Sequence, residues 1–148
     1  MTSRSPLDDS PAVSQVGLAL ASVAFAVLFG TGLIAVTLWG VRALQLGVSQ
    51  PTPAGNWGPG GGLLIFASVG GPVIAGLAAY ALMAPVKSYY RRGGLAIVAS
   101  FATVALALIT TVPIDHFIGP TGLLGLASIC AVLCLLMAWL ARRWAAAP

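Results

Sequence analysis

Four long apolar segments that contain no charged residue constrain the fold of this chain most strongly. They cover residues 16–39, 63–84, 95–112 and 123–141. As helices rising about 1.5 Å per residue they are roughly 27–36 Å long, and the hydrocarbon core of a bilayer is about 30 Å thick. Because a charge at the bilayer centre costs at least ~2.5–3.5 kcal/mol, segments without Asp, Glu, Lys or Arg are what a membrane requires.

The composition excludes a soluble enzyme domain, a disordered chain and a disulfide-stapled secreted module. Hydrophobic residues make up 59% of the 148 residues, charged residues only 7%, and the mean hydropathy is +0.99. A soluble chain of this size could not keep so much apolar surface from water. Each run is continuously apolar and about twice the ~9–11 residues of a barrel strand, which favours helices.

The sequence therefore predicts an all-α integral membrane protein, a four-transmembrane-helix bundle. One membrane domain spans residues 16–141, between an N-terminal tail, 1–15, and a C-terminal tail, 142–148. The first segment is too long, and its leader too weakly basic, for a cleaved signal peptide, so we expect it to remain as an anchor. Pro113 is expected to end the third helix, and Gly93-Gly94 to precede it.

Lys and Arg are distributed unequally between the two sides of the predicted bundle. With four spans, both tails and the connection between the second and third segments share one side, which holds six basic residues, whereas the other side holds only Arg42. Since cytoplasmic flanks collect Lys and Arg, we predict that both termini are cytoplasmic in an inner or plasma membrane. We expect lipid headgroups, and no nucleic acid, to contact Lys87, Arg91 and Arg92.

The two cysteines lie four residues apart in the fourth segment and therefore share one face of a helix. Two thiols supply half of a tetrahedral zinc site, and a disulfide between positions i and i+4 of a helix has poor geometry. Small residues let membrane helices approach closely. We therefore predict free thiols in a packing stripe that comprises Ala127, Cys130, Ala131, Cys134 and Ala138.

Asp115 and His116 form a polar pair in the outer loop expected between Pro113 and Gly122. A carboxylate can orient an imidazole for base catalysis or metal binding. No Ser or Cys nucleophile lies beside the pair in the sequence, and two ligands hold no metal firmly. We interpret the pair as a polar interfacial loop and predict no metal and no cofactor in the chain; a cofactor shared with another chain through His116 stays open.

Hydroxyl side chains follow one side of the third segment at Ser100, Thr103, Thr110 and Thr111. Such a stripe can line a solute path, although membrane Ser and Thr more often bond a neighbouring helix or their own backbone. In the second segment Pro72 removes a backbone hydrogen bond, so we expect a kink at Gly70-Gly71-Pro72. Broken helices line the binding sites of transporters, but a bend can equally serve packing.

These features favour a non-enzymatic accessory, scaffold or assembly subunit that acts through helix–helix contacts. Its partners would be the lipid bilayer and other membrane subunits or a second copy of the chain. The first alternative is a small oligomeric transporter or channel that uses the kinked second helix and the hydroxyl stripe. The second is a membrane redox or enzyme subunit that uses Asp115 and His116 or the cysteine pair.

Overall fold

The computed structural model describes residues 12–46, 61–84 and 88–145, and every regular element within these ranges is a helix. The helices are α1 (Ala12–Leu46), α2 (Gly61–Leu82), α3 (Tyr89–Phe117) and α4 (Pro120–Ala145). In lipid each backbone amide must be bonded inside its own segment, which a helix achieves alone. The prediction of an all-helical chain is confirmed for the described residues.

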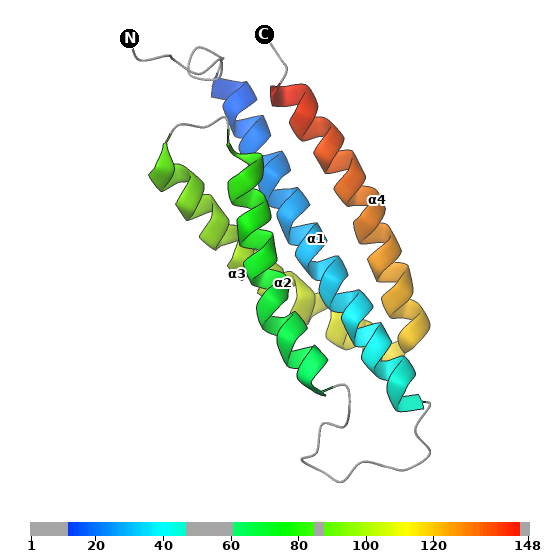
Figure 1. Ribbon diagram of the computed structural model, residues 1–148. Coiled ribbons are helices and arrows are strands. Elements are labelled where there is room, and N and C mark those ends of the chain that lie inside the picture. The colour runs from blue at the N-terminus through cyan, green and yellow to red at the C-terminus, as the bar shows by residue number, and fades with distance from the viewer. Residues whose placement is uncertain (1–11, 47–60, 85–87, 146–148) are drawn as a thin grey trace.

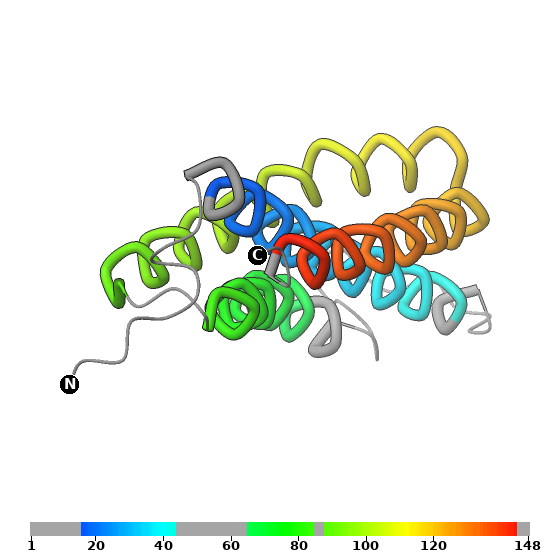
Figure 2. The backbone as a smooth tube through the Cα atoms, turned by 90° about the horizontal axis from the view of Figure 1, so that it is seen from above, coloured from blue at the N-terminus to red at the C-terminus, as the bar shows by residue number. Residues whose placement is uncertain are grey.

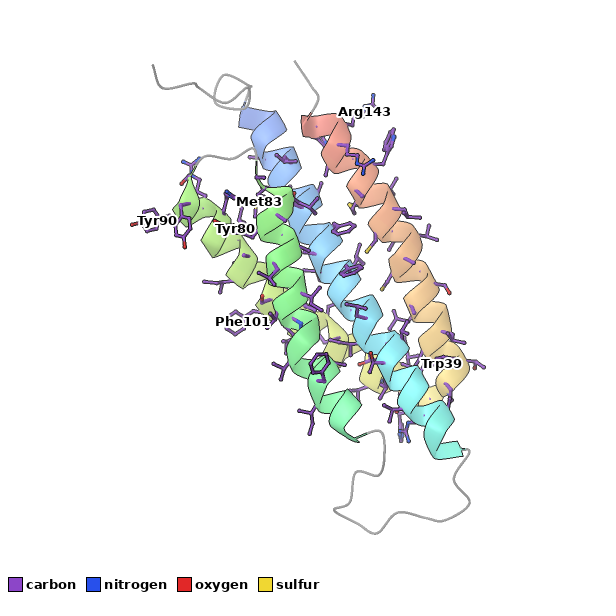
Figure 3. All side chains as sticks on the ribbon, in the orientation of Figure 1. Trp39, Tyr80, Met83, Tyr90, Phe101 and Arg143 are labelled. Atoms are coloured by element: carbon purple, nitrogen blue, oxygen red, sulfur yellow. The ribbon has the colours of Figure 1, made fainter. Side chains whose placement is uncertain are left out.

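All four helices are long and apolar enough to cross a membrane, which confirms the predicted number of helices of spanning length in the described part of the chain. Their apolar parts run over Val16–Ala43, Ile65–Leu82, Tyr89–Phe117 and Pro120–Trp144. Large apolar side chains face away from the other helices: Phe66, Phe101 and Leu135 are 75%, 73% and 74% exposed. Figure 3 shows Phe101 pointing outward from α3. Exposed apolar surface of this extent is typical of contact with lipid.

Consecutive helices run in opposite directions (Figure 1), and α1 makes the most extensive contacts with the rest of the bundle. It packs most extensively against α4, and α3 crosses behind α2 and α1 at a steep angle. Seen from above, α1 lies between α2 and α3 (Figure 2). Because α3 and α4 make few contacts, α4 is held in the bundle mainly by α1.

Glycines allow the closest approaches between the helices. A Cβ atom on Gly30 of α1 would stand 2.6 Å from Thr103 Cγ2 of α3 and 3.1 Å from the Gly71 carbonyl oxygen of α2. A Cβ on Gly76 of α2 would stand 2.5 Å from Ser100 Oγ of α3. Both distances are shorter than real Cβ contacts, so a side chain at either position would force a neighbouring atom to shift. The adjoining core is made of small residues and one methionine, namely Ala26, Ala75, Ala79, Met83 and Ala99.

The end of the third helix differs from its prediction, because α3 passes through Pro113 and continues to Phe117. Proline costs one backbone hydrogen bond but its φ angle suits a helix, and membrane helices tolerate it. The helix ends at Phe117 and is terminated by Gly119, which has a φ of 86° and whose N–H donates to the Ile114 carbonyl oxygen at 3.0 Å. A left-handed glycine of this kind is a common helix terminator.

The start of the third helix also differs from the sequence interpretation. Gly93 and Gly94 do not precede the helix but lie in its first turns, since α3 begins at Tyr89. Neither glycine would bring a Cβ within 4 Å of another residue, so no close contact explains them. In α1 the helix continues past the predicted span to Leu46.

Replacing Gly30 by Ala should destabilise the bundle, whereas Gly40→Ala should not. Both glycines lie in α1, so both substitutions gain the same helix propensity, but a Cβ at Gly40 meets nothing within 4 Å. Overpacking at a tight contact costs ~1–3 kcal/mol. Denaturant-induced unfolding of both variants in the same detergent measures the difference; equal midpoints would contradict the close crossing.

Candidate functional site

A groove of about 830 Å³ lies beside the C-terminal half of α1, at the end of the bundle that contains the α3–α4 turn. Because α2 and α3 are closest at Gly76 and Ser100, they diverge beyond this crossing and leave a wedge with α1 as its floor. The residues that line it are Ile34, Leu38, Arg42, Ser68, Val104, Ala107, Leu108, Thr111, Val112, Asp115, His116, Gly119 and Pro120. Its walls are therefore apolar along most of their length and polar at one end.

The polar end of the groove is held by an ion pair between α1 and α3. Arg42 Nη2 donates to Asp115 Oδ2 at 2.6 Å, and Arg42 Nε donates to Oδ1 at 3.1 Å. The Arg42 side chain is 47% exposed and that of Asp115 only 14%. This forked geometry fixes the orientation of the guanidinium and of the carboxylate, and it joins α1 to α3 through two residues that are 73 positions apart in the chain.

The polar pair predicted for an outer loop is instead helical, since Asp115 and His116 both lie in the last turns of α3. The Asp115 carboxylate accepts hydrogen bonds from Arg42, and the exposed His116 ring packs edge-on against Phe117 at 5.0 Å between centroids. The helical backbone after Pro113 is what carries the carboxylate to Arg42. Among the described residues Asp115 thus orients a guanidinium rather than an imidazole.

Each hydroxyl of the predicted polar stripe donates to a backbone carbonyl. Thr103, Thr110 and Thr111 donate to the carbonyl four residues earlier in α3. Ser100 Oγ lies 2.9 Å from the Pro72 carbonyl oxygen of α2 and 3.1 Å from that of Ala96. Thr103 and Thr111 are buried. The hydroxyls therefore serve the helices themselves, and of the four only Thr111 also lines the groove.

The stripe of small residues on α4 faces α1 in part. Cys130 and Cys134 are buried free thiols, and a Cβ on Gly32 of α1 would stand 3.3 Å from Cys130 Cβ. Cys134 Sγ lies 3.6 Å from the Phe25 carbonyl oxygen. Ala127 and Ala138 are half-buried, whereas Ala131 is exposed. The two thiols thus occupy the helix contact, where a larger side chain would force α1 and α4 apart.

Aromatic and basic side chains gather at the other end of the bundle, where α2 meets α3. Arg92 Nη2 donates to the Tyr80 carbonyl oxygen at 3.0 Å, and the guanidinium lies 4.0 Å from the Tyr80 ring centroid. Arg91 is exposed, and Lys87 lies outside the described residues. Figure 3 shows Tyr80, Tyr90 and Arg143 toward this end and Trp39 toward the opposite end. Arg92 therefore joins two helices, and of the three residues predicted to contact headgroups Arg91 is the described one that is exposed.

The pairing of Arg42 with Asp115 is the feature that the sequence interpretation missed. The signal for it was present, because these are the two charged residues expected on that side of the membrane. Opposite charges expected on one side of the membrane attract each other, so a contact between them is favourable. The prediction of a loop after Pro113 hid this ion pair, because a loop does not fix the direction of the Asp115 side chain.

The described residues hold no group of three or more His, Cys, Asp or Glu side chains placed to bind a metal ion. Comparison of the chain with protein-family models, with curated proteins and with solved structures gives no match. The function must therefore be inferred from the contacts, burial and charges of this chain's own side chains.

A double-mutant cycle on Arg42→Ala and Asp115→Ala should show favourable coupling. Since the Arg42 side chain is 47% exposed, we expect only ~0.5–1 kcal/mol, as for exposed ion pairs. Asp115→Ala alone should cost less than Arg42→Ala, because the latter leaves the more buried carboxylate unpaired. Unfolding midpoints of the four proteins in one detergent measure this, and additive effects would exclude an energetic pair.

Proposed function

We propose that this protein is a non-enzymatic accessory or scaffold subunit that binds another membrane helix through the outward face of α4. The observation that carries this proposal is an exposed line of small residues, Thr121, Gly125 and Ser128, on the side of α4 turned away from α1. Spacings of four and three residues place them on one helix face. The buried line of α4, which includes Leu123, Cys130 and Cys134, lies opposite.

The chemistry of this face suits a helix better than lipid. A Cβ on Gly125 would meet nothing within 4 Å, so the space beside this backbone is open to a neighbouring helix. Ser128 Oγ donates to the Leu124 carbonyl at 2.9 Å and does not need a partner's acceptor. Small faces of this kind let two membrane helices approach until their backbones touch, which lipid tails cannot reproduce.

The alternative of a transporter or channel receives less support. A polar path along α3 would need hydroxyls turned toward water, but Ser100, Thr103 and Thr110 donate to backbone carbonyls. The close packing at Gly30 and Gly76 favours one fixed arrangement of the helices. A redox or enzyme role would need the buried thiols or the Asp115 carboxylate, and these groups are engaged in helix contacts.

Two finer features belong to this proposal. In this proposal both termini are cytoplasmic, because Lys and Arg are more numerous on their side of the membrane. The second helix bends at Gly70-Gly71-Pro72, because Pro72 lies inside α2 without an N–H to donate. A spin-label distance between Phe66 and Leu82, compared in the native chain and in Pro72→Ala, measures that bend.

A photo-crosslinking residue at Ser128 should give one discrete protein adduct in native membranes. Ile109 of α3 is the matched control, because it is 71% exposed and lies at a similar depth from the α3–α4 turn. Gly125→Leu should weaken the adduct about tenfold, since overpacking this face costs ~1–3 kcal/mol. The adduct mass separates another subunit from a second copy, and adducts of equal yield at both positions would refute the proposal.

The orientation is tested by thiol labelling in a Cys130→Ala, Cys134→Ala background. Ile118→Cys lies at the α3–α4 turn and Ser88→Cys at the start of α3, at opposite ends of the bundle. An impermeant maleimide applied to intact cells should label Ile118→Cys and spare Ser88→Cys until the cells are lysed. The reverse pattern would place the termini outside.

A further inference from the structure

We propose that the groove beside α1 binds one zwitterionic phospholipid, with an acyl chain along its apolar walls and the headgroup at Arg42, Asp115 and His116. This inference is independent of the proposed role of the outward face of α4. The groove has about 830 Å³, within the ~300–1,000 Å³ range of small-molecule sites.

The length of the groove matches one leaflet of a bilayer. On α1 its lining runs from Arg42 back to Ile34, eight residues or about 12 Å. On α3 it runs from His116 back to Val104, twelve residues or about 18 Å. Half of the hydrocarbon core is ~15 Å thick, so the apolar part of the groove ends near the bilayer centre.

The rim of the groove is open to the side, where lipid would stand. Val104 and Leu108 of α3 line it and are 40% and 60% exposed. An acyl chain can therefore enter from the surrounding leaflet without crossing water. The floor residue Leu38 is half-buried on α1, and together these side chains offer only apolar contact to a guest.

The polar end of the groove offers one cation and one anion. The Arg42 guanidinium is 47% exposed, and Asp115, although bonded to it, also faces the groove. The connection between α1 and α2 adds no charged residue to this side. A net charge of zero gives an anionic headgroup no advantage, whereas a headgroup with both a phosphate and an ammonium meets a partner for each.

The two groups of a phosphoethanolamine head fit this arrangement. Its phosphate oxygens accept hydrogen bonds from Arg42 and from a ring N–H of neutral His116, and its ammonium donates to Asp115. Arg42 and Asp115 both lie in the last turns of their helices, at the depth where headgroups begin. A choline headgroup has no N–H and should bind less well than ethanolamine.

The test uses the full chain in vesicles of phosphatidylethanolamine, phosphatidylglycerol and phosphatidylcholine in equal amounts. After mild detergent extraction, native mass spectrometry counts the lipids that each protein molecule retains. We expect the native chain to retain one phosphatidylethanolamine. Leu108→Trp fills the groove and should reduce retention about tenfold, a change of ~1.4 kcal/mol. Leu77→Trp, at an equally exposed leucine of α2 outside the groove, should leave it unchanged.

A second variant tests the headgroup and does not depend on filling the groove. Asp115→Asn keeps the size and an acceptor for Arg42 but leaves the guanidinium charge uncompensated, so the preference should shift to phosphatidylglycerol. Arg91→Gln, an exposed change at the other end of the bundle, is the control and should not alter the preference. Equal retention of the three lipids, or an unaltered preference in Asp115→Asn, would overturn the proposal.

A photoreactive residue at Leu108 identifies what occupies the groove in native membranes. A phospholipid adduct supports the inference, and a peptide adduct overturns it because a protein helix would then cover the groove. This outcome is separate from the crosslink at Ser128, so either proposal can fail without the other.

Discussion

The close crossing of three helices at Gly30 is the contact on which the rest of the arrangement depends. At this point α1 meets the Gly71 backbone of α2 and the Thr103 side chain of α3, with no space for a single added methyl group. In a bilayer, where lipid tails are as apolar as leucine, such close packing supplies much of the energy that holds helices together. The crossing makes α1 the central helix and sets the angle at which α3 leaves the bundle.

The angle between α3 and the other helices produces the two features to which a function is assigned, namely the groove beside α1 and the uncovered face of α4. Because α3 diverges from α2 beyond Gly76, a groove opens along α1, and the Arg42–Asp115 pair closes its polar end. Because α3 and α4 touch little, one face of α4 packs on α1 while the opposite face stays uncovered. A helix that is attached along one side presents the other side to lipid or to a further helix.

The hydroxyl and thiol groups illustrate how polar atoms are accommodated in such a bundle. Thr103 and Thr111 are buried and donate to carbonyls of their own helix, and Ser100 links α3 to the Pro72 carbonyl of α2. In an environment without water each unpaired polar atom costs free energy, so these hydrogen bonds stabilise the helices. They also occupy the hydroxyl groups that a catalytic or solute-binding site would use. The ion pair differs, because it lies where water and headgroups can reach it.

The sequence alone determined that four apolar helices form, since only continuous apolar segments of bilayer length satisfy both lipid and the backbone. It also placed Cys130 and Cys134 on one helix face, because that follows from helical periodicity. It misplaced the end of the third helix, since proline stops helices in water more often than in membranes, and the terminator was Gly119. Only the tertiary structure decided that Arg42 meets Asp115 and that a groove opens beside them, because the angles between helices depend on which small residues touch.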